Sequence, residues 1–185
     1  MSRIRVIAGT ARGTRLRTVP GDSTRPIMDR VKENLFNILG MDVPNSTWLD
    51  MFAGTGSVGI EALSRGATSA RFLDNNRNAI QTIRTNLKTT RLTENAEIIQ
   101  TDALAYLAHP ADTAFDYIFI APPQYKSLWA TALRVVDENP GWLSDESWVI
   151  AQIDPLEMQA VELENLVEID QRRYGNTLLL FYEIQ

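Results

Sequence analysis

The sequence predicts an α/β fold built on a doubly wound parallel sheet, and three observations support this class. Segments with strand periodicity alternate with segments at helical spacing through most of the 185 residues. Residues 115–120 are nearly all apolar, which is typical of a central parallel strand covered on both faces. Gly54, Gly56 and Gly59 fit the G-x-G-x-x-G spacing between a predicted strand and a predicted helix. The length is that of one domain with a small appendage.

The first 40 residues predict a β-hairpin followed by a helix. Apolar residues at alternate positions of 4–8 predict one strand, and 14–19 suits the second arm before a Pro-Gly turn. Residues 29–39 have apolar side chains at helical spacing, and Gly40 marks the end of that helix. We expect residues 1–24 to form a basic N-terminal hairpin or arm, and 25–185 to form the main domain.

Strands and helices alternate along the rest of the chain. The apolar segments predict strands at 46–52, 70–73, 96–100, 115–120 and 147–153. Helical spacing predicts helices at 56–65, 77–89, 103–107 and 125–139. The last two strands, 166–172 and 177–183, look like the arms of a closing hairpin around Tyr174-Gly175-Asn176. We therefore expect a seven-stranded sheet with a C-terminal antiparallel hairpin and a separate small N-terminal hairpin.

The composition is that of a soluble globular protein, with 44% apolar and 22% charged residues. The absence of cysteine excludes disulfides, Cys-ligated zinc and a cysteine nucleophile. A single histidine, His109, leaves little room for histidine ligands, so we expect no metal. No run of about 18 apolar residues predicts a membrane span, and the N-terminus lacks the apolar segment of a signal peptide. We expect a cytoplasmic protein without a membrane partner.

Charge is distributed unevenly along the chain. Residues 1–32 carry eight basic and two acidic side chains, whereas the remainder carries 10 basic and 21 acidic ones. Seven of the eight are arginines, whose planar guanidinium groups suit phosphates and base edges. A basic segment on an acidic body is expected of a protein that binds a nucleic-acid backbone. The alternative is a solvated strand whose arginines form ion pairs with the acidic body.

Aspartates lie at or just after the ends of three consecutive predicted strands: Asp50, Asp74 and Asp102. Because parallel strands place their carboxyl ends at one edge, where ligands bind, we expect these side chains near one site. Asp50 would repel the pyrophosphate of a dinucleotide but suits S-adenosylmethionine, which carries an ammonium and a sulfonium group. Asp74 is placed to bind ribose hydroxyls and Asp102 lies beside the expected adenine position. Alternatively, the aspartates are helix N-caps and the glycines form only a tight turn.

Four segments match the sequence pattern of a known family. They are 5–9 with Arg12-Gly13 and Leu16; Arg25-Pro26 with 29–31 and 33–39; 50–56 continued by Glu61-Ala62-Leu63-Ser64-Arg65-Gly66-Ala67; and Tyr174-Gly175-Asn176. On these segments the chain resembles the RsmD family, the bacterial 16S rRNA guanine-N2 methyltransferases.

The resemblance implies a Rossmann-like methyltransferase fold with S-adenosyl-L-methionine as cofactor. It implies 16S rRNA, as such or within the small ribosomal subunit or an assembly intermediate, as the partner. It places the cofactor contacts at Asp50, Phe52, Gly54, Gly56, Asp74, Asn75, Asp102 and Ala103. It places the RNA contacts in the basic segment, at Arg3, Arg5, Arg12, Arg15, Arg25 and Arg30.

The motif after strand 115–120 departs from the family pattern. The family has Asp or Asn followed by Pro-Pro and Tyr or Phe, whereas this chain reads Ala121, Pro122, Pro123, Gln124 and Tyr125. A carboxylate or amide oxygen at the first position would accept a hydrogen bond from the guanine amine. Ala121 has no such side-chain oxygen, so only its backbone carbonyl could accept one. These five residues remain the candidate catalytic set. Pro122 can offer its carbonyl, Gln124 a substitute amide oxygen, and Tyr125 a ring to stack on an extracted base.

We therefore expect an S-adenosylmethionine-dependent RNA methyltransferase that methylates N2 of a guanine in 16S rRNA. The alternatives are a catalytically impaired homologue that binds cofactor and RNA during ribosome assembly, or a methyltransferase with a different nucleic-acid target. Asp50 and the Pro-Pro pair disfavour a nicotinamide oxidoreductase. The chain shows no evident target-recognition domain of a DNA amine methyltransferase.

Overall fold

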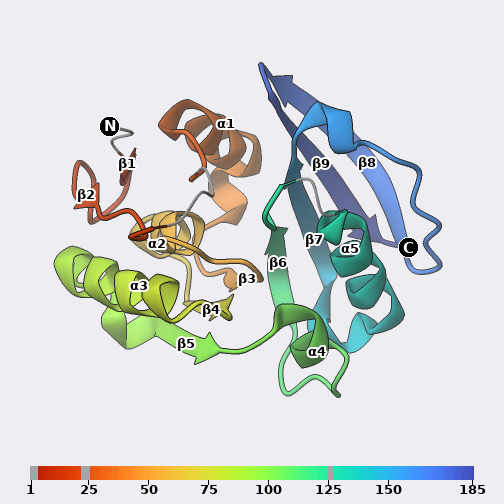
Figure 1. Cartoon of the computed structure of the whole chain (residues 1–185), viewed down its shortest axis with the longest axis horizontal. Helices are drawn as coiled ribbons and strands as arrows, with labels where there is room; N and C mark the ends of the chain where they lie inside the picture. The colour runs from red at the N-terminus through yellow and green to blue at the C-terminus, as the bar shows by residue number, and fades with distance from the viewer. Residues whose placement is uncertain (1–3, 22–25, 125–126) are drawn as a thin grey trace.

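The computed structural model describes residues 4–21, 26–124 and 127–185. A seven-stranded sheet in the order β5-β4-β3-β6-β7-β9-β8 carries helices on both faces (Figure 1). Its strands are β3 Thr47–Asp50, β4 Ser69–Asp74, β5 Ala96–Gln100, β6 Phe115–Ile120, β7 Leu143–Ile153, β8 Leu166–Tyr174 and β9 Thr177–Ile184. The helices are α1 Asp29–Leu39, α2 Ser57–Ser64, α3 Arg77–Thr90, α4 Ala103–Leu107 and α5 Leu128–Glu138. Single 3₁₀ turns lie at Gly40–Asp42, Thr93–Asn95, Pro140–Trp142 and Pro155–Glu157.

The strand directions confirm the predicted fold class. β5, β4, β3, β6 and β7 are parallel to one another, whereas β9 is antiparallel to both β7 and β8. A separate antiparallel pair joins β1 Ile4–Arg5 to β2 Arg15–Leu16. The protein is therefore a doubly wound sheet that ends in a C-terminal hairpin, with a small N-terminal hairpin beside it.

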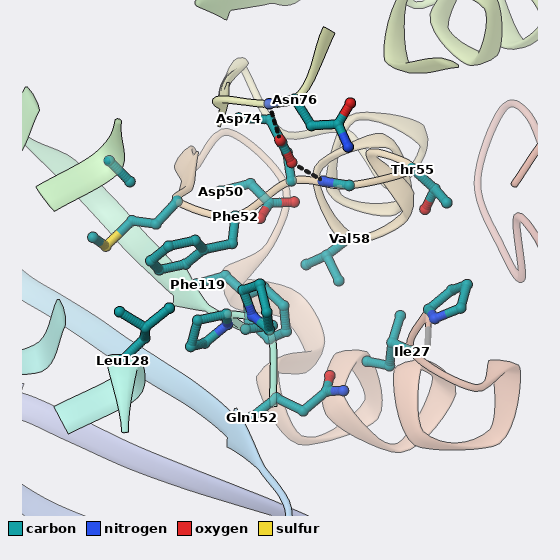
Figure 2. Close-up of a pocket in the computed structure, with 18 of the residues that line it drawn as sticks. Ile27, Asp50, Phe52, Thr55, Val58, Asp74, Asn76, Phe119, Leu128 and Gln152 are labelled. Atoms are coloured by element: carbon teal, nitrogen blue, oxygen red, sulfur yellow. Dashed lines mark hydrogen bonds between the residues drawn. The ribbon is translucent and has the colours of Figure 1, made fainter. Parts of the chain in front are cut away.

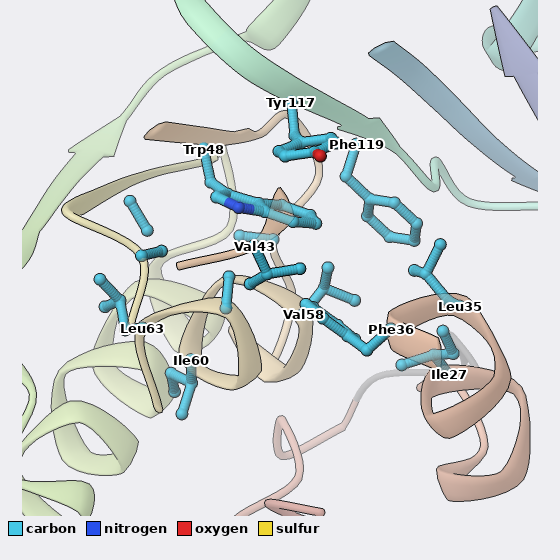
Figure 3. Close-up of a cluster of buried hydrophobic side chains, with 14 of the residues drawn as sticks. Ile27, Leu35, Phe36, Val43, Trp48, Val58, Ile60, Leu63, Tyr117 and Phe119 are labelled. Carbon is cyan, nitrogen blue, oxygen red and sulfur yellow. The ribbon is translucent and has the colours of Figure 1, made fainter. Parts of the chain in front are cut away.

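Two hydrophobic cores lie on the two faces of the sheet, because side chains of a strand alternate between faces. On β6, Phe119 packs with α1, α2 and α3, whereas Ile118 and Ile120 pack with α4 and α5. In the first core, Trp48 lies between Phe36 and Tyr117, with ring centroids 5.3 and 4.6 Å away (Figure 3). This packing fixes the central strands on which the candidate site is built.

The N-terminal segment, residues 4–21, forms shorter strands than its sequence predicts. After β1 the Val6 amide still donates to the Thr14 carbonyl at 2.9 Å, but the next two amides, those of Ile7 and Ala8, donate to the Glu61 carboxylate on α2. β2 ends at Leu16 because the Arg17 amide donates to Asn86 on α3. Beyond Val6 and Leu16, hydrogen bonds to two helices thus replace the expected continuation of the hairpin.

Most other boundaries agree with the prediction to within two residues, and two differ by more. β7 begins at Leu143 and not at 147, and the polar residues 144–146 hid its first half; its pairing with β6 shifts register between Phe115 and Tyr117. Helix α5 begins at Leu128, after Ser127 in a left-handed conformation that cannot continue a helix toward the N-terminus. The predicted start at residue 125 lies outside the described residues.

Glu61 is a completely buried acid that joins the N-terminal segment to α2. Its Oε2 accepts from the Ile7 amide at 2.9 Å, and its Oε1 accepts from the Ala8 amide at 3.1 Å and from Arg65 Nε at 2.8 Å. Lys32 Nζ lies 3.5 Å from Oε2 and is itself completely buried. The carboxylate is therefore satisfied by two backbone amides and two cations.

Lys32 extends this connection to the first turn of α2. Its Nζ donates to the Arg5 carbonyl at 2.6 Å and to Ser57 Oγ at 2.8 Å. Burial lowers the pKa of Lys32, and the nearby charge of Glu61 opposes that shift. The pair thus links α1, the N-terminal segment and the helix that follows the glycine loop.

No helix in the described ranges has both the length and the apolar character needed to cross a membrane.

Candidate functional site

A pocket of about 690 Å³ opens at the carboxyl edge of the sheet. Its walls come from the ends of β3, β4, β6 and β7, from the glycine loop after β3, and from two pieces of chain near the N-terminus (Figure 2). Ligands of doubly wound sheets bind at this edge, outside the carboxyl ends of the strands. We call it the sheet-edge pocket.

The glycine loop turns beside this pocket in a conformation that requires glycine. Gly54 has φ +55° and Gly56 has φ +77°, values that other residues rarely adopt. A Cβ atom at Gly54 would meet nothing within 4 Å, so the backbone there faces open space. At Gly59 a Cβ atom would lie 2.4 Å from the Phe72 ring, so this third glycine allows α2 to pack on β4. The first glycine leaves room for a ligand, and the third serves packing.

Asp50, the last residue of β3, presents a buried carboxylate to the sheet-edge pocket. The side chain is 2% exposed, and Oδ1 finds no hydrogen-bond donor among the residues that the structure describes. Burial, followed by the charge of Asp74, raises the pKa of Asp50 to about 7, and the backbone amides of Gly59 and Phe52 oppose the shift. A buried acceptor without a donor is costly, so this site favours a cationic or hydrogen-donating ligand.

Asp74 and Asp102 line the same pocket but also hold the local backbone. Asp74 accepts from the Gly54 amide at 2.9 Å and from the Asn76 amide at 2.8 Å (Figure 2). Asp102 is the N-cap of α4, where Oδ1 accepts from the Ala105 amide at 2.8 Å. The N-cap interpretation therefore holds for Asp102 without removing it from the pocket. Phe52, Asn75 and Ala103 also line the pocket.

The motif after β6 forms another part of the wall. The structure places Ala121, Pro122, Pro123 and Gln124 around the pocket, with Gln124 exposed. Tyr125 lies outside the described residues. Seven of the eight candidate cofactor residues and four of the five residues of the candidate catalytic motif thus line one cavity. The exception among the cofactor residues is Gly56, where a Cβ atom would face Ile60 and Ile83 and not the pocket.

The described arginines of the basic segment are exposed. Arg5 forms an ion pair with Asp29 at 3.3 Å, and its side chain remains 63% exposed. Arg12, Arg15 and Arg30 are exposed as well. Arg3 and Arg25 lie outside the described residues.

Sequence reasoning missed several residues of the wall. Thr18, Val19 and Ile27, which precede β3 by many residues, reach the pocket, as does Gln152 near the end of β7. Their positions depend on how the N-terminal segment and β7 pack against the glycine loop and β6. No spacing in the sequence signals that arrangement.

In the described part of the chain, no three His, Cys, Asp or Glu side chains form a group that could hold a metal ion.

The strand order, the glycine loop and the acidic strand end define the class of protein: a Rossmann-like methyltransferase, whose usual methyl donor is S-adenosylmethionine. An RNA methyltransferase from Salinibacter ruber, solved with S-adenosyl-L-homocysteine, has this fold, with a TM-score of 0.66 over 86% of this chain and 94% of that one at 15% identity. The solved structure of the Escherichia coli protein yhhF has a TM-score of 0.85 at 32% identity, covering 99% of this chain and 98% of that one.

Sequence comparison identifies the family. The family model described as conserved hypothetical protein 95 matches residues 4–183. The ribosomal RNA small subunit methyltransferase D of Haemophilus influenzae is 37% identical over 153 residues, which cover 82% of this chain and 79% of the relative. The chain therefore belongs to the RsmD family, and the resemblance seen in its motifs is confirmed.

Proposed function

We propose that this protein transfers a methyl group from S-adenosylmethionine to the exocyclic N2 of a guanine in 16S rRNA. The main support is that the buried Asp50 carboxylate, one oxygen of which has no hydrogen-bond donor among the described residues, lines the same cavity as Pro122 and Pro123. This arrangement suits a cationic methyl donor held next to a base, and the family contains enzymes named for methylation of small-subunit ribosomal RNA.

The cofactor residues fit S-adenosylmethionine. Asp50 offers a carboxylate oxygen to the ammonium or sulfonium group of S-adenosylmethionine. A neutral ligand would leave the charge of this carboxylate uncompensated. Gly54 leaves its backbone uncovered for close approach. Asp74 orients the loop through Gly54, yet each carboxylate oxygen has a second acceptor site for a ribose hydroxyl. In Asp102, Oδ1 accepts from the Ala105 amide, and Oδ2 could accept a hydrogen bond from the adenine part of the ligand.

The chain's own residues contribute mainly positioning and hydrogen bonding. When bound, S-adenosylmethionine supplies an electrophilic methyl group. The lone pair of the guanine amine is delocalised into the ring. A hydrogen bond from the amine to the Pro122 carbonyl would localise that lone pair for attack on the methyl group. Gln124 would provide a second acceptor, and Tyr125 a stacking surface for the extracted base. Holding the amine in line with the methyl group lowers the entropic part of the barrier.

The direct test compares ribosomal RNA from cells with and without this protein by mass spectrometry of nucleosides. We expect one N2-methylguanine of small-subunit RNA to disappear with the protein and to return when purified protein and S-adenosylmethionine are added to those subunits. Unchanged methylation in both experiments would contradict the proposal.

Ala121 favours a second candidate function, a protein that binds cofactor and RNA during small-subunit assembly without turnover. In other enzymes, loss of a positioned hydrogen-bonding group slows the reaction by about 100- to 1000-fold. Small subunits that assemble normally only with the protein, yet gain no methyl group from it, would favour this candidate.

Restoring the motif acid should raise activity. Because Ala121→Asp returns an acceptor where the amine arrives, we expect faster methyl transfer to small subunits than with the parent. Deleting Gln124 in the same chain should increase it further, since the aromatic residue would then follow the proline pair directly. Gln124→Ala should lower parent activity without changing cofactor affinity by calorimetry. A parent already at full rate and indifferent to all three changes would show that backbone carbonyls suffice.

Charge reversal in the basic segment should weaken RNA binding. Arg12→Glu with Arg15→Glu removes two exposed cations, so the slope of log affinity against log salt should flatten by about one unit per lost phosphate contact. Cofactor affinity should not change. The matched control is Arg134→Glu with Arg173→Glu, which makes the same charge change at exposed sites away from this segment. An Arg12/Arg15 variant with the parent's salt slope would mean that these arginines only cover the protein surface.

A further inference from the structure

Gln152 is a polar side chain in the wall of the sheet-edge pocket that the proposed mechanism does not use. It lies one residue before the end of β7, is half-buried, and lines the pocket with Ala121 and Pro122. Its Oε1 is buried, and no donor for it exists among the residues that the structure describes. An amide oxygen in this state is available to a ligand, because binding one breaks no existing hydrogen bond of that atom.

Strand register places Gln152 beside Ala121. In the parallel pair of β6 and β7, the last residue of β6, Ile120, lies opposite Ala151. Ala121, which follows β6, therefore comes opposite Gln152 of β7. Neighbouring strands are about 4.8 Å apart, so the two residues are adjacent. The position that lacks the family's acid therefore has an amide on the next strand.

Both residues lie on the same face of the sheet. Ile120 and Ala151 pack in the core under α4 and α5, and side chains alternate along a strand. Ala121 packs against the opposite core, and Leu179, the β9 partner of Gln152, belongs to that core as well. Gln152 thus lies on the Ala121 side, where the motif's missing acid would stand.

Two apolar side chains, Phe119 and Ile27, lie near the amide of Gln152. In Figure 2, Gln152 lies on the other side of Phe119 from Asp50, and its amide points toward Ile27. Apolar neighbours lower the local dielectric constant, which strengthens a hydrogen bond between this amide and a ligand. A change of side-chain rotamer would turn the edge of the amide, with both Oε1 and Nε2, toward the pocket that the residue lines. That edge then presents one acceptor and one donor to a ligand.

We propose that Gln152 binds the Watson–Crick edge of the target guanine. Oε1 accepts the hydrogen of the ring N1–H, and Nε2 donates to O6, which leaves N2 free to receive the methyl group. The inference rests on the proposed function and deepens it, since it assigns the choice of base to a residue outside the Pro-Pro motif. Ala121 leaves the space that a ring needs beside this amide.

The first test is methyl transfer by Gln152→Leu, a variant of similar size without donor or acceptor. We expect kcat/KM for small-subunit RNA to fall about 10- to 100-fold, the range for loss of a bidentate contact to a base. Affinity for S-adenosylhomocysteine and the salt dependence of RNA binding should not change. Gln171→Leu, the same substitution at an exposed position of β8, is the matched control and should behave as the parent.

Gln152→Glu tests which edge is bound. A carboxylate can accept from the two neighbouring N–H groups of guanine, but it repels the bare ring nitrogen of adenine. We expect this variant to retain more activity than Gln152→Leu, with methylguanine as its product. A Gln152→Leu variant with the parent's kcat/KM, or one whose loss follows weaker S-adenosylhomocysteine binding, would overturn the assignment.

A second readout needs no turnover. With saturating S-adenosylhomocysteine, ligand-observed NMR should show that the parent binds guanosine monophosphate more strongly than adenosine monophosphate, and that Gln152→Leu loses this preference. A parent that transfers methyl groups to guanine but binds both nucleotides alike would overturn the role of Gln152 alone. A parent that discriminates between them but transfers no methyl group would overturn the proposed activity and support the base contact.

Discussion

Replacing Glu61 by alanine should reduce the free energy of unfolding by about 3–5 kcal/mol, the usual cost of breaking a buried ion pair. The change would leave the buried ammonium of Lys32 without its carboxylate partner and the amides of Ile7 and Ala8 without an acceptor. Chemical denaturation followed by circular dichroism measures the effect. Hydrogen exchange at Ile7 and Ala8 should accelerate, because the N-terminal segment would lose its attachment to α2.

The matched control is Glu97→Ala, which removes an acid that is 56% exposed in its ion pair with Arg71. Arg71 keeps its second ion pair, with Asp112 at 2.7 Å, and an exposed carboxylate contributes little, so this variant should lose no more than about 1 kcal/mol. Lys32→Met combined with Glu61→Leu should recover part of the loss, because neither charge then remains buried alone. A Glu61→Ala variant as stable as Glu97→Ala would show that the buried pair contributes little to folding.

Asp50 should make cofactor affinity depend on pH. Its pKa is raised to about 7 in the ligand-free protein, whereas a bound cation requires the ionised carboxylate. Binding of S-adenosylmethionine by the parent should therefore tighten roughly 20-fold from about pH 5.5 to about pH 7.5, as one proton is displaced. Asp50→Asn should bind roughly 10- to 100-fold more weakly at about pH 7.5, since it loses a charge-assisted hydrogen bond, and it should lack this pH dependence.

The stability of the ligand-free protein should change in the opposite direction. The raised folded-state pKa means that the native state holds a proton on Asp50 that the unfolded chain, with the usual value of 3.8, releases. The stabilising contribution is complete below about pH 4 and is lost as the pH rises through about 7. At about pH 8, Asp50→Asn should be more stable than the parent and yet bind more weakly. Asp145→Asn, at an exposed position of β7, should change neither property. Parent affinity that is flat across this range would refute an ionised Asp50 as the cofactor contact.

The parts of the site that follow from local sequence were predictable. The glycine spacing located the loop, and Asp50, Asp74 and Asp102 share a pocket because parallel strands end at one edge. The order of the strands was not predictable from any one of them. The position of Gln152 depends on that order, since it lies beside Ala121 only because β7 pairs with β6.

The N-terminal segment shows the same limit of sequence reasoning. Its alternating pattern predicted a hairpin, and a short one exists. The pattern contained no information on Glu61, 53 residues beyond Ala8, whose carboxylate accepts from the amides of two residues of the predicted strand. Long-range hydrogen bonds of a buried acid therefore shortened an element that local periodicity extended.

The packing of residues 4–21 and of Ile27 determines how the proposed RNA-binding surface can be tested apart from the rest of the protein. Ile4, Val6, Leu16 and Ile27 belong to the core formed with α1, α2 and α3. The described arginines between them, Arg5, Arg12, Arg15 and Arg17, are exposed. A truncation that removes the basic surface would also expose apolar core residues. A loss of RNA binding in such a variant could then result from misfolding and not from the lost arginines. The same segment moved to another scaffold would leave behind the helices that shape it. Single charge substitutions are therefore the suitable way to test this surface, because they leave the apolar side chains of the segment in the core.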